Sequence, residues 1–365
     1  MRPDVPPAAK GQIFMQTTDI AIIGAGLAGL TCAHVLYGRG MTVTVIEAAE
    51  RIGGRIHALR DAEGKALADL GPTWVWPPHQ PVVASWLDRL GLATFAQAND
   101  GDAVIEGYHP APVRAPLPGQ DGMVRIAGGP SAMVQAMAAA LPGAALQLNR
   151  RITRIDSAID GLILTDHTGH QTAALQVVLA TPLRVAAADI AMPDAPAALL
   201  QAMRATPTWM AGQAKAVMLY DRPFWRAQGL SGRIASRIGP LTEVHDHSSA
   251  DGQAALFGFI GLPPAARDPA QLKAAIRAQL ARCLGPEAGA PLSIMIQDWA
   301  RDPLICTPAD HDGAHPDLPP AILRQPHMGG RLHLAVSETS SRSPGLIEGA
   351  LDAGQTTAEA ILSRR

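Results

Sequence analysis

The sequence predicts an α/β protein of two domains, and three observations support this prediction. Two short apolar runs within residues 19–46 flank a stretch of helical character. Residues 144–181 alternate apolar and polar side chains, with turns at Asp160-Gly161 and Thr168-Gly169, which predicts a small antiparallel sheet. The chain has 365 residues, and one domain typically takes about 100–200.

The first elements form one unit. Residues 19–23 are an apolar run that ends at a glycine, as expected of a buried parallel strand. Residues 27–39 predict a helix closed by Gly40, and residues 42–46 predict a second strand rich in β-branched side chains. A strand, a helix and a strand in this order predict a right-handed βαβ unit.

The rest of the chain predicts mixed elements. We expect helices over 131–141, 186–205, 270–284 and 344–362, and strands over 214–220, 252–261 and 332–336. Residues 77–125 and 301–327 are rich in proline and are expected to be irregular. Ser343 is the expected N-cap of the last helix, with Pro344 at its first position.

The composition excludes several classes of protein. Apolar residues make up 47% of the chain and charged residues 17%, which is globular rather than disordered. The net charge of −2 argues against a nucleic-acid binder with a basic face. Cys32, Cys283 and Cys306 are too few and too scattered for a disulfide framework or a metal site. They indicate a reducing compartment, so we expect a cytoplasmic protein.

Neither a targeting segment nor an integral membrane segment is expected. The first residues carry prolines and charges without the apolar core of a secretory signal, and either Met1 or Met15 fits a translation start. The most apolar window, residues 20–36, is too short and too rich in glycine to span a bilayer.

A dinucleotide site is predicted at the first turn. Residues 24–29 read Gly-Ala-Gly-Leu-Ala-Gly between the predicted strand and helix, and Glu47 ends the next strand. Gly24 permits a tight turn, Gly26 lets the backbone approach a pyrophosphate, and Gly29 lets the helix pack on the sheet. The carboxylate of Glu47 suits a ribose diol and repels a 2′-phosphate, which disfavours NADP. We expect contacts from Gly24, Gly26, Ala28, Gly29 and Glu47.

Further motifs follow in the order typical of one family. They are residues 47–56 (EAAERIGGRI), 69–74 (DLGPTW), 128–131 (GGPS), 151–155 (RITRI), 180–182 (ATP), 220–225 (YDRPFW), and 337–354, which is similar to G-T-E-T … G-Y-x-E-G-A-x-x-A-G. From residue 18 onward the chain resembles the flavin-containing amine oxidases, which include monoamine, polyamine and L-amino-acid oxidases. The resemblance implies FAD in a Rossmann-type, NAD(P)-binding-like domain beside a substrate domain of mixed sheet and helices.

The resemblance also implies roles for particular residues. Arg55 would reach the FAD phosphates or ribose, Glu338 the ribityl hydroxyls, and the Ile152 backbone the adenine. The last helix would point its positive dipole end at the flavin ring. The implied FAD contacts are Gly54, Arg55, Gly71, Pro72, Thr73, Ile152, Glu338, Leu346 and Ile347.

The chain departs from the family at the flavin attachment point. Monoamine oxidases bind FAD covalently through a cysteine nine residues after a tryptophan that Trp299 matches. The ninth residue here is Pro308, and Cys306 lies two positions away. We therefore expect non-covalent FAD, with Cys306 a small loop or core residue.

The substrate side departs as well. In the family two tyrosines flank the substrate amine, but their positions here hold Ala309 and Leu346. Aromatic walls must therefore come from tryptophans or Tyr108. The main candidates are Trp74 and Trp299, with Trp76 as a further one. In the family a flavin-facing lysine usually follows a Gly-Phe-x segment; Gly258-Phe259-Ile260 matches that segment, but Pro263-Pro264 occupies the position of the lysine. We interpret Lys215 as a strand residue. The catalytic residues stay unassigned. About fifty residues separate Trp74 from the Gly128 segment, which predicts a reduced cap.

Two histidine clusters, 245–247 (HDH) and 311–315 (HDGAH), are interpreted as polar loops rather than a metal pair or proton relay, because no further ligands have a matching spacing. No metal is expected. Asp298 and Arg301 flank Trp299 and fit either a substrate-orienting or a surface role.

The full reading is an FAD-dependent oxidoreductase. The FAD domain takes 18–80, 126–184 and 328–365, and the substrate domain takes 81–125 and 185–327. The favoured reaction is oxidation of a small-molecule amine or amino-acid derivative: hydride goes to flavin, water hydrolyses the imine, and oxygen reoxidises the flavin. The alternatives are a carbon–carbon desaturase or isomerase acting on an apolar substrate, and a non-catalytic flavin-binding protein.

Overall fold

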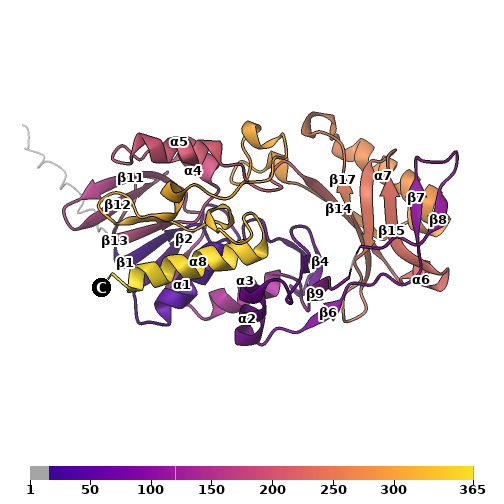
Figure 1. The fold of residues 1–365 in the computed structure, drawn as a ribbon, viewed down its shortest axis with the longest axis horizontal. Helices are drawn as coiled ribbons and strands as arrows, with labels where there is room; N and C mark the ends of the chain where they lie inside the picture. The colour runs from indigo at the N-terminus through magenta and orange to yellow at the C-terminus, as the bar shows by residue number, and fades with distance from the viewer. Residues whose placement is uncertain (1–15, 120, 365) are drawn as a thin grey trace, which may run out of the picture.

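Two large sheets lie at opposite ends of an elongated molecule (Figure 1). The computed structural model describes residues 16–119 and 121–364. The chain crosses between the two ends several times, so each end is assembled from segments far apart in the sequence.

The first sheet has seven strands in the order β10-β2-β1-β13-β12-β11, with β19 pairing β13 as well. Its strands are β1 (Gln16–Ile23), β2 (Val43–Ile46), β10 (Leu146–Gln147), β11 (Ile152–Ala158), β12 (Gly161–Asp166), β13 (Gln171–Leu179) and β19 (Leu332–Leu334). The pairs are parallel except those of β12, which is antiparallel to β11 and β13. The predicted βαβ unit and antiparallel strands are confirmed.

Both faces of this sheet are covered. Ile20 and Ile22 of β1 pack on one face, and Ala21 and Ile23 pack on the other, because side chains alternate along a strand. The first face carries α1 (Leu27–Tyr37), α2 (Pro81–Leu90), α3 (Ser131–Ala139) and α8 (Ile347–Leu362). The second face carries α4 (Leu183–Asp189) and α5 (Ala197–Ala205).

Three sequence predictions differ from the observed helices. Residues 186–205 form α4 and α5 rather than one helix, because Pro193 and Pro196 interrupt the stretch. Residues 81–90, expected to be irregular, form α2 with a proline in its first turn and buried Val83, Trp86 and Leu87. The last helix begins at Ile347 with Leu346 as N-cap, not at Pro344 after Ser343, because Gly345 has a φ of +82°.

The second sheet has the order β18-β14-β17-β16-β15-β7-β8. Its strands are β7 (Asp102–Glu106), β8 (Val113–Ala115), β14 (Ala214–Tyr220), β15 (Leu230–Ser236), β16 (Leu241–Asp246), β17 (Ala254–Ile260) and β18 (Ser293–Asp298). The long helix α7 (Pro269–Leu284) buries Leu272, Ile276 and Leu280 in the core of this sheet, and the short helix α6 (Phe224–Ala227) adds Phe224 and Trp225.

Small sheets lie between the large ones: β3 (Ala58–Arg60) pairs with β4 (Ala66–Asp69), and β9 (Val124–Ile126) pairs with β5 (Trp74–Val75) and β6 (Thr94–Ala96) (Figure 1). Two segments assigned above to the substrate domain, α2 and α4–α5, pack in the cores of the first sheet. No helix within 16–119 or 121–364 has the length and apolar character of a membrane span.

Candidate functional site

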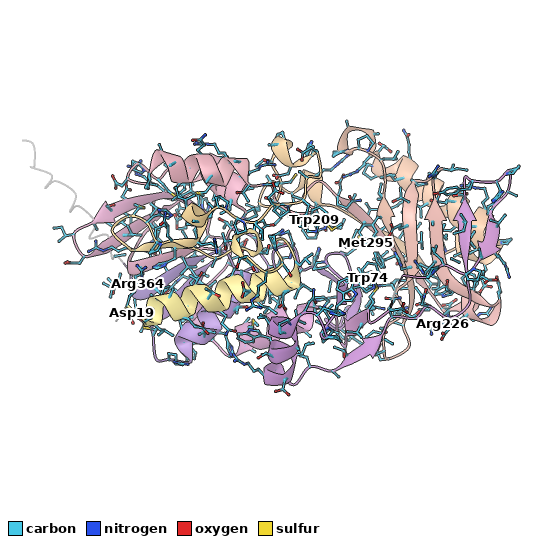
Figure 2. All side chains as sticks on the ribbon, viewed as in Figure 1. Asp19, Trp74, Trp209, Arg226, Met295 and Arg364 are labelled. Carbon is cyan, nitrogen blue, oxygen red and sulfur yellow. The ribbon has the colours of Figure 1, made fainter. Side chains whose placement is uncertain are left out.

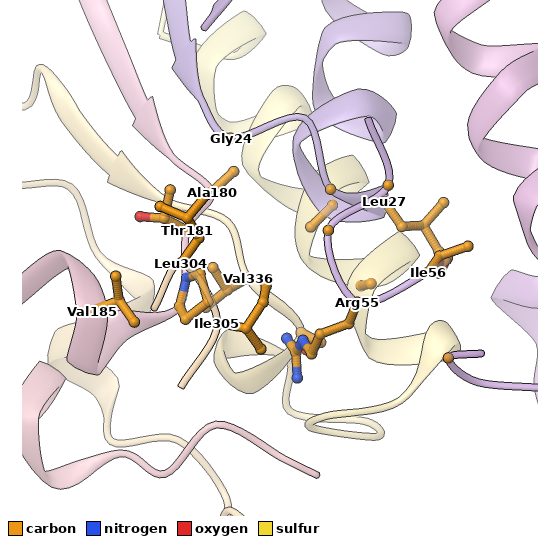
Figure 3. Close-up of a pocket in the computed structure, with 18 of the residues that line it drawn as sticks. Gly24, Leu27, Arg55, Ile56, Ala180, Thr181, Val185, Leu304, Ile305 and Val336 are labelled. Atoms are coloured by element: carbon orange, nitrogen blue, oxygen red, sulfur yellow. The ribbon is translucent and has the colours of Figure 1, made fainter. Parts of the chain in front are cut away.

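A long cavity runs from the first sheet toward the second. It encloses about 1760 Å³ of space not filled by atoms, its solvent-open mouth included. Figure 3 shows Gly24, Arg55, Ala180 and Val336 around it, contributed by distant parts of the chain. Most of the predicted cofactor residues line this cavity: Gly24, Gly26, Ala28, Glu47, Gly54, Arg55, Gly71, Pro72, Ile152, Leu346 and Ile347.

The first glycine loop behaves as its sequence predicts. Gly24 has a φ of +107°, and a Cβ built there would lie 2.7 Å from the Ala180 carbonyl oxygen. A Cβ on Gly29 would lie 2.1 Å from the Gly24 carbonyl oxygen, so only glycine lets α1 pack this close to the turn. A Cβ on Gly26 would meet no described atom within 4 Å, although Gly26 lines the cavity. The space above Gly26 therefore fits an approaching pyrophosphate.

A second glycine loop lies against the first. The Gly53 N–H donates to the Ala25 carbonyl oxygen at 2.8 Å, and Gly26 and Gly53 form an isolated parallel bridge. Gly54 has a φ of +57°, and its Cβ position lies 3.5 Å from the Gly26 Cα. Glycine backbone thus forms both walls of a slot beside the N-terminus of α1. Such a slot, with exposed N–H groups and the positive end of a helix dipole, suits phosphates.

Glu47 stands at the carboxyl end of β2, as predicted, and is 9% exposed. Its Oε2 accepts the Ala25 N–H at 2.7 Å, and its Oε1 accepts the Ala49 N–H at 2.8 Å. These bonds hold the carboxylate at the cavity wall, near Ile152 at the start of β11. This end of the cavity fits an adenosine group.

Arg55 and Glu338 form a bidentate ion pair although 283 residues separate them. Arg55 Nη1 lies 2.6 Å from Glu338 Oε1, and Nη2 lies 2.9 Å from Oε2. Glu338 also accepts the Trp209 N–H at 3.1 Å. Burial favours its neutral form, but Arg55 and these hydrogen bonds outweigh burial and hold the pKa of Glu338 below its ordinary value. Arg55 faces the cavity, and Glu338, 2% exposed, lies behind it.

The middle of the cavity is formed by Gly71, Pro72 and the start of α8. A Cβ on Gly71 would lie 2.0 Å from the Arg55 carbonyl oxygen, so glycine is needed where these chains cross. Thr73 is 2% exposed and lies behind the wall that Gly71 and Pro72 form. Leu346 and Ile347 place the N-terminus of α8 at the cavity, where its dipole favours negative charge.

The far part of the cavity has tryptophan walls. Trp74 and Trp299 line it, as predicted, together with Trp76 and Trp209. Figure 2 shows Trp74 and Trp209 in the middle of the molecule, between the two large sheets. Trp74 donates to Gln97 Oε1 at 2.8 Å, and Trp299 donates to the Leu70 carbonyl at 3.3 Å, which fixes both rings.

Tyr108 supplies no wall, because it is 54% exposed at the β7–β8 turn and stacks on Arg237. Trp209 was missed in the sequence because it lies in an irregular segment outside the family motifs.

Lys215 is the second residue that sequence reasoning missed. It is 5% exposed on β14, lines the cavity, and donates from Nζ to the Gly71 carbonyl oxygen at 2.6 Å. Nζ also lies 4.7 Å from the centre of the Phe259 ring. Burial lowers the pKa of Lys215 to about 8, while Asp69 acts in the opposite direction.

Lys215 lies on a strand, as the sequence predicts, but that interpretation missed its burial at the wall of the cavity. β14 pairs with β17, and Lys215 stands opposite Phe259, so the neighbouring strand supplies the amine. The signal was a lysine inside the buried run of residues 214–220.

The remaining candidates lie outside the cavity wall. Asp298 pairs with Arg267 at 2.7 Å and with Arg301 at 3.3 Å, which ties a loop together. His245, Asp246 and His247 are at most 5% exposed, so the polar-loop interpretation of this cluster was wrong.

In the second cluster, His315 contacts the Trp209 ring at 4.4 Å. Across the residues the structure describes, no group of three or more His, Cys, Asp or Glu side chains is placed to hold a metal ion.

Comparisons with known proteins agree with this geometry. The flavin containing amine oxidoreductase family matches residues 27–117 and 111–362. A Mycobacterium tuberculosis protein assigned as a flavin-containing monoamine oxidase is 25% identical, covering 94% of this chain and 96% of its own. That alignment spans 456 residues against the 365 of this chain, so the relative carries insertions that this chain lacks.

Solved structures show the same fold. A putrescine oxidase bound to putrescine has a TM-score of 0.79 at 22% identity, over 96% of this chain and 100% of its own. The cyclohexylamine oxidase of Brevibacterium oxydans has a TM-score of 0.81 at 21% identity, over 95% and 99%.

Proposed function

Because the chain belongs to the flavin containing amine oxidoreductase family, we propose that it oxidises an amine or amino-acid derivative with bound FAD. The observation that carries this proposal is the continuity of one cavity, which joins the two glycine loops to the tryptophan walls and Lys215. The family match does not favour a desaturase or a non-catalytic flavin protein.

The residues present fit FAD along the whole cavity. Glu47 and Ile152 would hold the adenosine, Gly26, Gly54 and Arg55 the phosphates, and Gly71 with Pro72 the ring. Further contacts would come from Gly24, Ala28, Leu346 and Ile347, which line the cavity, while Gly29, Thr73 and Glu338 would support the FAD site from behind the wall. Bound FAD would supply the redox chemistry, which is acceptance of hydride from the carbon that bears the amine, with oxygen as the final acceptor. Asp298 makes no contact in this arrangement, whereas His245 and His315 pack against the rings of Trp74 and Trp209.

The attachment of FAD is proposed to be non-covalent. Cys306 is 8% exposed, and its Sγ–H points at the Thr307 carbonyl oxygen, 3.3 Å away. Burial raises the pKa of this thiol to about 11, which keeps it protonated and unreactive. Because the cysteines of the described chain are free, we also infer a reducing, cytoplasmic location.

The tryptophans would hold the body of the substrate. Leu346 stands where the resemblance implies a tyrosine. Trp209 packs against the preceding residue, since a Cβ on Gly345 would lie 2.5 Å from the Trp209 Cβ. Trp209 therefore supplies an aromatic wall that Leu346 does not. We propose a bulky amine, held mainly by apolar contacts.

Anaerobic mixing of the FAD-loaded protein with candidate substrates tests this function. Bulky arylalkyl amines or amino-acid esters are expected to bleach the flavin band, and benzylamine is expected to do so slowly. Trp209→Ala should raise KM for the bulky amine with flavin content unchanged, and Trp209→Phe, which keeps an aromatic face, should restore it. If no amine bleaches the flavin and polyenes or tetrapyrrole precursors do, the proposal fails.

A further inference from the structure

A second cavity lies beside the small sheet of β3 and β4. It holds about 650 Å³ of space not filled by atoms, open solvent included, and none of the residues that line it lines the first cavity. Lys65 and Asp251 both line it and form an ion pair at 2.5 Å, each about half exposed. Deeper in, Asp69 and Arg125 line the wall and are at most 5% exposed. The cavity therefore joins a surface ion pair to a buried carboxyl group.

Asp69 lines the second cavity, two residues before Gly71, which lines the first. Its Oδ2 lies 3.5 Å from His247 Nε2 and 3.9 Å from an Arg125 nitrogen. A Cβ on Gly129 would lie 2.2 Å from Asp69 Oδ1, so glycine leaves this carboxyl group its room. Two residues further along the chain, the Gly71 carbonyl accepts the hydrogen bond from Lys215, which lines the substrate side.

Buried polar atoms lack hydrogen-bond partners in Arg125, which lines the second cavity, and in the two residues before Ser249, which also lines it. Among the described residues, Arg125 Nε, His247 Nδ1 and Ser248 Oγ are buried without a hydrogen-bond partner. His247 Nε2 accepts the Asp69 N–H at 2.8 Å, so its ring proton sits on Nδ1. Buried polar groups are almost always satisfied, and this cavity has Asp69 and Arg125 on its wall and room for ordered water. Water is therefore the expected partner of Arg125 Nε.

The charges around Asp69 favour proton exchange near neutral pH. Burial raises the pKa of Asp69 to about 6, while Arg125 on β9 and Lys215 on β14 act in the opposite direction. His247, which follows β16, stays neutral because burial holds its pKa well below the ordinary value. Burial likewise holds the pKa of His245 on β16 low. Asp69 and Lys215 thus change charge within reach of pH 6 to 8.

We propose that Asp69 carries protons between Lys215, in the substrate cavity, and water in the second cavity. This proposal rests on the proposed function, because an amine arrives as an ammonium ion and must lose a proton before its carbon is oxidised. An N–H bond of the ammonium breaks, the electron pair stays on nitrogen, and the neutral Lys215 amine takes the proton. The proton passes through water to the Asp69 carboxylate, forming an O–H bond, and leaves to water in the second cavity. One proton moves, and nothing is oxidised or reduced in this step.

The second cavity explains why this route is useful. A bulky substrate between Trp74, Trp209 and Trp299 would displace water from the part of the first cavity that these rings line. The wall at Asp69 belongs to the other cavity, so the exit for the proton stays open while substrate is bound.

Asp69→Asn tests the relay. We expect flavin reduction by a bulky amine to slow about 10²-fold at pH 7 and to recover toward pH 10, where more substrate arrives neutral. Ala127→Leu, which narrows the second cavity and keeps every charged group, should show a smaller loss with the same pH dependence. Asp251→Asn, at the exposed mouth, is the control and should leave the profile unchanged.

Carboxyl ¹³C NMR with labelled aspartate gives a readout without substrate. One aspartate of the wild-type protein should titrate near pH 6, and this signal should be missing in Asp69→Asn. An Asp69→Asn profile parallel to that of the wild type, or no aspartate titrating between pH 5 and 7, overturns the proposal.

If Asp69→Asn does not fold, Ala127→Leu with an unchanged profile overturns it instead. A protein with the pH 6 titration whose flavin no amine bleaches refutes the proposed function, while proton exchange at Asp69 stands.

Discussion

Gly26→Val should separate folding from cofactor binding. Gly26 has φ −71° and ψ 174°, a conformation open to any residue, and a Cβ there meets no described atom within 4 Å. The added side chain would project into the cavity where the pyrophosphate approaches. If it removes two charge-assisted hydrogen bonds from backbone N–H groups, at about 1.5–3 kcal/mol each, the loss is about 3–6 kcal/mol. That corresponds to about 10²–10⁴-fold in Kd.

The assay is FAD titration of the apoprotein by flavin fluorescence, with thermal unfolding measured in parallel. Gly26→Val should unfold like wild-type apoprotein and bind FAD weakly. Gly29→Val is the contrasting variant: its Cβ would lie 2.1 Å from the Gly24 carbonyl oxygen, so it should lose the fold itself. Gly143→Ala, in an exposed turn with open space around it, is the neutral control. A soluble Gly26→Val protein with the Kd of wild type would refute the cofactor placement.

Three further predictions test other parts of the site. Cys306→Ser should keep full flavin content, and acid precipitation of the wild type should leave all flavin in the supernatant; colour in the pellet would show a covalent bond. Glu47→Gln should weaken FAD binding about tenfold, since an amide cannot accept both the Ala25 and Ala49 N–H groups; an unchanged Kd would remove its role. Glu348→Gln should lower stability by about 1.5–3 kcal/mol in a denaturant titration, because its carboxylate caps α2 through the Val82 and Val83 N–H groups; Glu359→Gln, in the last turn of α8, is the control.

The first sheet and its glycine loop were predictable from local pattern. Strand β1 alternates between two cores, and the turn after it has the spacing of the fingerprint, so short-range rules were sufficient. The second sheet was only partly predictable: β14 and β17 stood out as apolar runs, but β7 and β15 pair in parallel although their first residues are 128 positions apart. Pairing at that distance leaves no local periodicity.

The site residues also differ in whether local sequence patterns reveal them or only the tertiary structure brings them together. Gly24, Gly26 and Glu47 could be found because one turn brings them together. The Arg55–Glu338 pair could not, because it depends on β19 and α8 returning to the first sheet. The place of Lys215 at the cavity could not be predicted, because it depends on the pairing of β14 with β17, which sets Lys215 opposite Phe259.

The packing of α8 against α1 also has a consequence for biosynthesis. A Cβ on Gly354 of α8 would lie 2.3 Å from the Ala28 carbonyl oxygen of α1, so the first and last helices meet backbone to backbone. Ile347, Leu351, Ala358 and Ile361 complete the core around α1. Until α8 leaves the ribosome, the nascent chain exposes that apolar surface of α1, although its glycine loop was made much earlier. The growing chain is therefore prone to aggregation until α8 has been made.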